Sequence, residues 1–167
     1  MGKLRIVSGN ILDYLDNMDA IVNSNNQYMM CGSGVCGLIY KTANKNKLEE
    51  YCKNNFKEQM KTNEVRITKG FDLGLDIIHI YCPKYYESKN PIEELKQSYI
   101  NFLKIAKEKG YKNIVSVSLG TGVHGYKHNE IAKTIVELLT SMVNETEITF
   151  TLVLQNEEIM QLYNSSQ

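Results

Sequence analysis

The sequence predicts an α/β fold, a three-layer α/β/α sandwich in which helices cover both faces of a mixed, mostly parallel central sheet. Three observations lead to this prediction. Short β-branched runs alternate with amphipathic runs of about 10–20 residues. Several of the short runs are apolar on both faces, as buried parallel strands are. No linker, composition shift or internal repeat divides the chain, so we expect residues 1–167 to form one domain.

Six runs have the composition of strands. The run MDAIVNSN carries Ala20, Ile21 and Val22 in succession, which indicates a central strand. Only the short stretch KGFDLG joins the third and fourth runs, so we expect these two to pair antiparallel, with Pro83 ending the fourth. The predicted strands are residues 3–9, 18–25, 63–68, 75–83, 112–119 and 147–154.

Helical spacing of apolar residues marks the segments between these strands. Residues 35–60 are predicted as two helices broken around NKNK. The clearest helix is 91–110, because Pro91 stands in its first turn with two glutamates behind it and lysines precede Gly110. The remaining predicted helices are residues 129–143 and 156–164, the second capped by Asn156.

The composition excludes several classes of protein. Hydrophobic residues make up 43% of the 167 residues, enough for a folded core. Nineteen basic residues balance nineteen acidic ones, so the surface is not globally basic and we expect no binding to duplex nucleic acid. No apolar run approaches the roughly 20 residues of a membrane span, and no signal-peptide core is present. We therefore expect a cytoplasmic, monomeric protein that does not bind membranes.

Two glycine-rich loops have the composition of a phosphate site: residues 23–37 (NSNNQYMMCGSGVCG) and 118–129 (SLGTGVHGYKHN). Each follows a predicted strand and precedes a predicted helix, where open α/β sheets bind ligands. Glycines allow backbone N–H groups at helix starts to hold phosphate oxygens without lysine or arginine. Asn23, Asn25, Asn26, Ser118 and Thr121 add neutral polar groups. The alternative interpretation is that both loops are simply tight strand-to-helix turns.

The cysteines suggest zinc as another alternative, with Cys31, Cys36 and Cys82 joined by His79 or His124. The sequence lacks the Cys-x-x-Cys pair typical of such sites, and His79 falls in a strand that faces the core. We therefore expect free thiols, no metal and no cofactor. His124 is expected to be exposed, as a ligand contact or by chance. His128 is expected to be a solvated residue at a helix start.

The chain resembles the macrodomain family, which binds ADP-ribose, over about residues 5–154. The family's Gly-Asp-Ile, DAIVNAAN, GGGVDGAIH, IT-x-G, IHxVGP and STGIFGYP resemble, in this order, VSGNIL (7–12), DAIVNSNN (19–26), CGSGVCGLIY (31–40), RITKGFDL (66–73), IHIYCP (78–83) and LGTGVHGYK (119–127). The resemblance implies a partner that is ADP-ribose or an ADP-ribosylated protein.

It also implies roles for individual residues. Asn26 would bond the distal ribose, the loop 32–35 would surround that ribose and one phosphate, and the loop 118–126 would hold the diphosphate, with Tyr126 against the distal ribose. Together with Asn26, the implied ligand-binding residues are Asn10, Ile11, Asn23, Gly32, Ser33, Gly34, Val35, Ser118, Gly120, Thr121, Gly122, Val123, His124, Gly125, Tyr126 and Leu154.

The sequence departs from the family pattern at both ends of the implied site. Asn10 stands where an aspartate usually accepts a hydrogen bond from adenine, and residues 154–156 lack the aromatic that usually stacks on it. Cys36 replaces the aspartate that positions water in many hydrolytic members, and Tyr40 replaces a common histidine. A thiol is an adequate base only where its pKa is lowered, which a helix N-terminus can do.

Three functions remain open at this point. The first is hydrolysis of ADP-ribose from acidic side chains, with Asn26 and Cys36 as candidate catalytic residues and a phosphate-bound water attacking the anomeric carbon. The second is a non-catalytic module that reads ADP-ribose, which the changes at positions 10, 36 and 154–155 favour. The third is a pocket that has diverged to another phosphorylated nucleotide.

Overall fold

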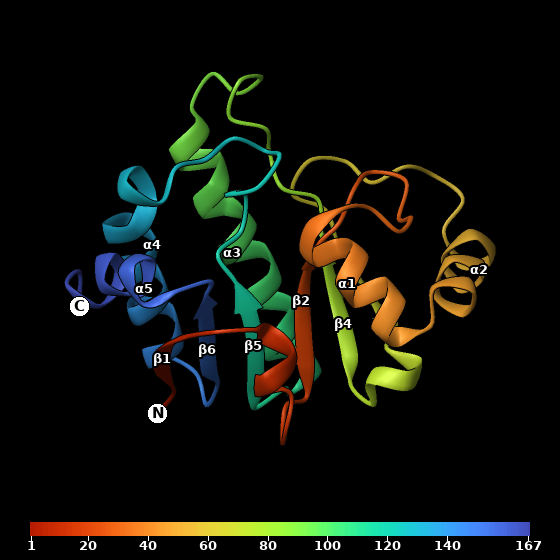
Figure 1. The fold of residues 1–167 in the computed structure, drawn as a ribbon, viewed down its shortest axis with the longest axis horizontal. Helices are drawn as coiled ribbons and strands as arrows, with labels where there is room; N and C mark the ends of the chain where they lie inside the picture. The colour runs from red at the N-terminus through yellow and green to blue at the C-terminus, as the bar shows by residue number, and fades with distance from the viewer.

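The computed structural model describes residues 1–167 and contains a six-stranded sheet between two layers of helices (Figure 1). The strand order is β1-β6-β5-β2-β4-β3, and all neighbours are parallel except β3 and β4. The mixed, mostly parallel sheet and its antiparallel pair are thus confirmed. The strands are β1 (Lys3–Ser8), β2 (Ala20–Ser24), β3 (Val65–Lys69), β4 (Asp76–Ile80), β5 (Asn113–Val117) and β6 (Thr149–Leu154).

Helices cover both faces of the sheet, which confirms the α/β/α sandwich. Helices α3, α4 and α5 pack on one face, and α1, α2 and the short 3₁₀ helix η1 pack on the other (Figure 1). A second 3₁₀ helix, η2, connects β3 to β4. The helices are α1 (Gly34–Ala43), α2 (Lys45–Asn55), α3 (Pro91–Lys109), α4 (His128–Asn144), α5 (Glu157–Asn164), η1 (Ile11–Tyr14) and η2 (Phe71–Leu73).

The predicted break between the first two helices lies at Asn44. Its backbone has a φ of 111°, and its side-chain oxygen accepts a hydrogen bond from the Lys47 N–H at 3.3 Å, capping α2. Helix α2 then ends at Asn55, so residues 56–60 are not helical. Asn156 caps α5 as predicted, accepting from the Ile159 N–H at 2.9 Å.

Alternation along the central strands divides the core between the two helical layers. In β2, Ala20 and Val22 face α3 and α4, whereas Ile21 faces α1. The ring of Phe102 in α3 stacks on Phe150 in β6, with centroids 5.9 Å apart and planes at 27°. These buried contacts hold the sheet between its helical layers.

The strands β2 and β5 pair only near their amino ends. Their register joins Ala20 to Ile114 and Ile21 to Val115, and no pairing follows. Beyond these residues β2 leads into α1 on one face, and β5 leads into α4 on the opposite face. The fold therefore has a topological switch point between β2 and β5, where α/β proteins bind ligands.

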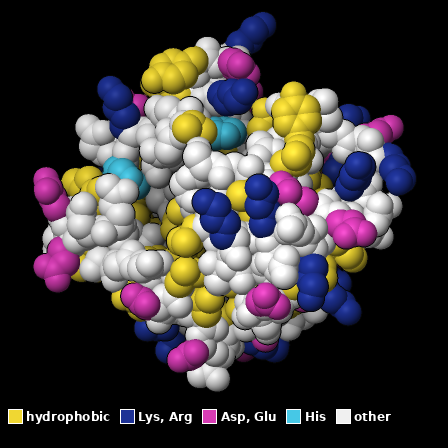
Figure 2. Space-filling model, turned by 45° about the vertical axis from the view of Figure 1, so that its right-hand side comes forward, with side chains coloured by type: hydrophobic (Ala, Val, Ile, Leu, Met, Phe, Trp, Pro, Cys, Tyr) yellow, Lys and Arg dark blue, Asp and Glu magenta, His cyan; other side chains and the backbone are white.

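No helix is both long and apolar enough to cross a membrane. Figure 2 shows lysine and arginine side chains interspersed with acidic ones over the face that it draws, as the equal numbers of basic and acidic residues suggest.

Replacing Phe102 tests the core on the α3 side of the sheet. Phe102 is fully buried, so Phe102→Ala is expected to lower the free energy of unfolding by about 3–5 kcal/mol in urea denaturation. Tyr86→Ala is the control, because Tyr86 is 82% exposed, and we expect a change within about 0.5 kcal/mol. Equal losses in the two variants would contradict this packing.

Candidate functional site

A cavity of about 490 Å³ opens at the carboxyl ends of β1, β6, β5 and β2, within the range of about 300–1,000 Å³ typical of small-molecule sites. It brings together most of the residues singled out in the sequence, from both glycine-rich loops and from the end of β1. Those that line it are Asn10, Ile11, Asn26, Gly32, Ser33, Gly34, Val35, Cys36, Ser118, Gly120, Thr121, Gly122, Val123, His124 and Leu154.

Three of the singled-out residues are not among those that line the cavity. Tyr126 is 3% exposed and packs in the core, where its hydroxyl donates to the Pro91 carbonyl at 2.7 Å, so its ring does not reach the cavity. Asn23 is fully buried beneath the first loop. Gly125 adopts a φ of 88°, a conformation that favours glycine in this turn.

The cavity lining also contains residues that are not among the implied ligand-binding residues, although Asn25 and Gln155 were placed near the site from the sequence. Most follow from their place at the carboxyl end of a strand, a signal that is present in the sequence. His128, expected to be solvated, is instead half-buried at the cavity, and its Nδ1 lies 2.7 Å from the Tyr163 hydroxyl. The additional lining residues are Gly9, Ser24, Asn25, Leu38, Val117, His128, Val153 and Gln155.

The lining contains no lysine, arginine, aspartate or glutamate. Helix α1 begins at the cavity, its N-cap Ser33 makes no side-chain capping bond, and no acidic residue lies in its first turn. The first-turn N–H groups and the positive end of the helix dipole therefore remain available to an anion. A Cβ on Gly37 would lie 2.3 Å from the Gly32 carbonyl oxygen, so this glycine lets the loop pack tightly onto α1.

Asn26 organises the first loop. Its Nδ2 donates to the Met30 carbonyl at 2.6 Å, and its Oδ1 accepts from the N–H groups of Tyr28 and Met30 at 3.0 and 3.2 Å. The turn also uses Met29 at a φ of 54°. One N–H of the Asn26 amide remains without a protein partner and is available to a ligand hydroxyl.

A buried polar network supports this loop from below. Nδ2 groups of Asn23 and Asn25 donate to Nδ1 of His79 at 3.2 and 3.0 Å, so the ring proton is on Nε2, which donates to the Thr68 hydroxyl at 2.9 Å. Burial, reinforced by the charge of Arg66, lowers the pKa of His79 to about 3. Neutral His79 thus fixes Asn25.

Asn25 connects this buried network to the first loop. Its Oδ1 accepts from the Asn26 backbone N–H at 2.8 Å, and its Nδ2 also donates to the Tyr40 hydroxyl at 2.9 Å. The Asn23 Oδ1 is buried without a protein partner. This network anchors Asn26 to the sheet through hydrogen bonds that are largely excluded from water.

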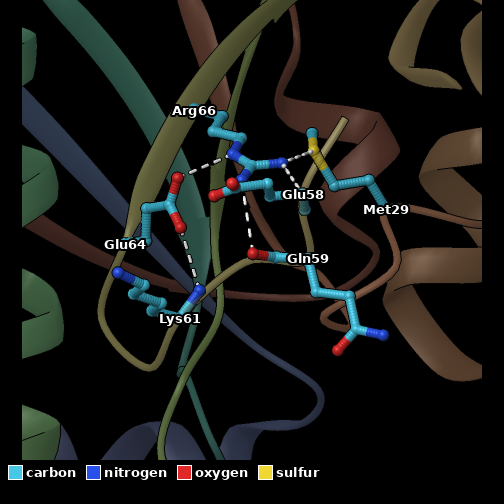
Figure 3. A network of polar contacts seen from close by, with 6 residues as sticks. All are labelled: Met29, Glu58, Gln59, Lys61, Glu64 and Arg66. Atoms are coloured by element: carbon cyan, nitrogen blue, oxygen red, sulfur yellow. Dashed lines mark hydrogen bonds and ion pairs between the residues drawn. The ribbon is translucent and has the colours of Figure 1, made fainter. Parts of the chain in front are cut away.

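Arg66 supports the loop from its outer side. Its Nε donates to Glu64 at 2.7 Å, and its Nη1 donates to the Met29 sulfur at 3.4 Å and to the Glu58 carbonyl at 3.0 Å (Figure 3). The guanidinium also lies 4.9 Å from the centroid of the Phe56 ring. The donors of the Arg66 guanidinium are used in these contacts, so Arg66 supports the loop. It does not line the cavity.

Known proteins are similar to this chain in sequence and in fold. The model of the Macro domain family matches residues 22–135. This chain belongs to the macro domain family. An O-acetyl-ADP-ribose deacetylase of Escherichia fergusonii is 32% identical to it over 170 residues, which cover 97% of this chain and 93% of the relative.

Solved macrodomains superpose closely on this one. The Oceanobacillus iheyensis macrodomain with ADP has a TM-score of 0.88 at 30% identity, covering 99% of this chain and 90% of that one. A mutant of the same protein with ADPR has a TM-score of 0.84 at 28% identity, covering 96% and 89%. The cavity described above thus lies in a fold whose solved relatives include complexes with these nucleotides.

Cys36 does not have the properties of a catalytic base in this macro domain. It lines the cavity at the first turn of α1, and its Sγ lies 3.5 Å from Asn25 Oδ1. Burial nevertheless raises the pKa of the Cys36 thiol, because desolvation outweighs the hydrogen bonds that would lower it. The thiol stays protonated at neutral pH, which argues against the catalytic role considered for it from the sequence.

No group of three or more histidine, cysteine, aspartate or glutamate side chains is placed to hold a metal ion. All four cysteines are free thiols, and His79 lies fully buried within the asparagine network rather than beside Cys31 or Cys36 as a ligand. Cys36 lies in the core cluster on the α1 side of the sheet, and Cys31 packs against that cluster.

The His79 network makes stability depend on pH. His79 binds a proton near pH 6.5 when unfolded but near pH 3 when folded, so its contribution is complete above the higher value and falls as pH decreases between the two. In urea unfolding, the free energy of unfolding of the wild type is expected to fall by up to about 1.4 kcal/mol per pH unit as pH decreases through this window. The His79→Gln variant is expected to lack this dependence. Thr68→Val is the matched control, since it weakens the network but keeps the slope. A His79→Gln profile parallel to wild type would refute the assignment.

Proposed function

We propose that this macro domain binds ADP-ribose in the cavity and hydrolyses carboxylic esters of its distal ribose, with ADP-ribose linked to an acidic protein side chain as the substrate. The observation that carries the proposal is an uncharged cavity at the switch point, bordered by two glycine-rich loops and the free N-terminus of α1. Such a site holds a diphosphate through backbone N–H groups.

The positions of the lining residues indicate how ADP-ribose would be oriented in the cavity. Asn10, Leu154 and Gln155 lie at the β1 and β6 end and would receive adenine, whereas Asn26 and the loop from Gly32 lie at the β2 end and would receive the distal ribose. The diphosphate would lie between them, against the loop that follows β5. The hydrolysed bond would then lie near Asn26.

The deacetylase relative supports the ester specificity. An acetyl group on ADP-ribose and an ADP-ribosylated glutamate are both carboxylic esters of the distal ribose. Both reactions need water held beside this ribose, at the anomeric carbon for a glutamate linked there and at the acyl carbon for an acetyl group on a ribose hydroxyl.

A non-catalytic reader is the second candidate. It is favoured by the absence of any carboxylate in the cavity lining and by the protonated Cys36, which together remove the usual means of positioning water. A reader would bind ADP-ribose in the same way without turnover.

Gly122→Glu tests the binding site. A Cβ on Gly122 meets nothing within 4 Å, so the variant is expected to fold, but its carboxylate would repel a diphosphate. Calorimetry is expected to give micromolar ADP-ribose affinity for the wild type and a loss of at least about 10-fold for the variant, about 1.4 kcal/mol. Gln161→Glu adds the same charge on α5, outside the cavity lining, and is expected to bind like the wild type.

Turnover is then measured with a glutamate-linked ADP-ribosyl peptide and with O-acetyl-ADP-ribose. Release of either acyl group by the wild type, absent in Gly122→Glu, supports the hydrolase. Binding without release of either supports the reader, and no ADP-ribose binding at all overturns both functions.

The adenine end offers a gain-of-function test. Gln155 is exposed and lines the cavity next to Leu154, where the family usually has an aromatic residue. Gln155→Phe is expected to tighten ADP-ribose binding by about 1–3 kcal/mol through stacking on adenine, measured by calorimetry. Glu157→Phe is the control, because Glu157 lies outside the cavity lining in the first turn of α5. Equal effects of the two substitutions would contradict the placement of adenine.

A further inference from the structure

We propose that His124 is the general base of this site, accepting through Nε2 the proton of the water that attacks the distal ribose. The inference rests on the hydrolase activity proposed above and names the group that activates its water. His124 lies in the loop after β5 and lines the cavity beside Gly122 and Val123.

Few groups at the cavity are chemically suited to act as a general base. The lining has no carboxylate and no lysine, and the Cys36 thiol stays protonated because burial raises its pKa. Asparagine amides and hydroxyl groups are too weakly basic. Only the imidazoles of His124 and His128 remain.

His128 lies at the wrong end of the cavity for this task. Its Nδ1 is 2.7 Å from the hydroxyl of Tyr163, a residue of α5, and α5 packs against β1 and β6. That is the end where Leu154 and Gln155 would receive adenine. A base there would be far from the bond that breaks.

His124 lies instead at the end that holds Asn26. Its ring meets the ring of Tyr81 edge-on, with centroids 6.0 Å apart, directly after β4. The Tyr81 hydroxyl donates at 2.8 Å to the side chain of Gln27, the residue next to Asn26. A short series of contacts thus connects His124 to the proposed distal-ribose end.

The backbone fixes the tautomer of His124. Its Nδ1 lies 3.1 Å from the Pro83 carbonyl oxygen, and a carbonyl can only accept, so Nδ1 carries the proton of the neutral ring. Nε2 therefore has the lone pair, and it makes no hydrogen bond to the protein. The His124 carbonyl also accepts from the Tyr85 N–H at 2.8 Å, which holds the residue in position. An oriented neutral imidazole with a free Nε2 is the arrangement that general-base catalysis requires.

The proposed step balances without a cofactor. The water oxygen forms a bond to the anomeric carbon as its proton passes to His124 Nε2, and the bond from that carbon to the ester oxygen breaks. The carboxylate leaves with the electron pair, and the imidazolium, stabilised by the Pro83 carbonyl at Nδ1, returns its proton to solvent.

His124→Ala tests the proposal in the full chain, with the glutamate-linked ADP-ribosyl peptide as substrate. We expect kcat to fall by about 100- to 10,000-fold, the usual contribution of general acid–base catalysis, with ADP-ribose affinity within about threefold of wild type. Added imidazole is expected to restore turnover in His124→Ala, since the small base then occupies the vacated space. Tyr86→Gln, at an exposed position of the neighbouring segment outside the cavity lining, is the control and is expected to retain wild-type kcat without any response to imidazole.

The outcomes separate this proposal from the function on which it rests. A wild type that binds ADP-ribose but releases nothing overturns the hydrolase and the base together. A wild type that turns over, with a His124→Ala variant of equal kcat, overturns the base alone and leaves the substrate's own phosphate to activate water. Loss of kcat without rescue by imidazole, or with an equal loss of affinity, assigns His124 to positioning or binding and contradicts the proposal.

Discussion

The functional site depends on the limited pairing between β2 and β5. These strands share register only at Ala20–Ile114 and Ile21–Val115, and they then lead into helices on opposite faces of the sheet. The two glycine-rich loops consequently diverge and leave a cavity between them instead of closing over the strand ends. The cavity lies between these loops, beside the N-terminus of α1.

The cavity is suited to an anionic ligand although its lining side chains carry no charge. Its lining lacks ionised side chains, and the positive potential comes from helix and backbone N–H groups. Beneath it, a neutral His79 accepts from two asparagine side chains, and Asn25 in turn fixes the backbone of Asn26. Burial keeps His79 uncharged, so this network does not compete electrostatically for an anion. The first loop is therefore already ordered before a ligand binds, so binding costs little conformational entropy.

The fold could be predicted almost entirely from the sequence, because strand runs and helix caps such as Asn44 and Asn156 leave local signals. The two loops could be located for the same reason. Side-chain direction within them could not: Asn23 and Tyr126 occur among residues that line the cavity, yet both are buried, since alternation and turn geometry direct them inward. The raised pKa of Cys36 and the contact of His128 with Tyr163 depend on tertiary packing, for which one sequence carries no signal.

In the proposed binding mode, one cavity receives adenine at the β6 end and the distal ribose at the β2 end. Comparative calorimetry of the wild type with ADP-ribose, ADP and AMP tests it most directly, because these ligands successively lose the distal ribose and one phosphate. We expect affinity to fall at each step, with ADP-ribose binding at least about 10-fold more tightly than AMP, a difference of about 1.4 kcal/mol. Equal affinities for all three would mean that the two glycine-rich loops do not hold the diphosphate and distal ribose, and would contradict the account.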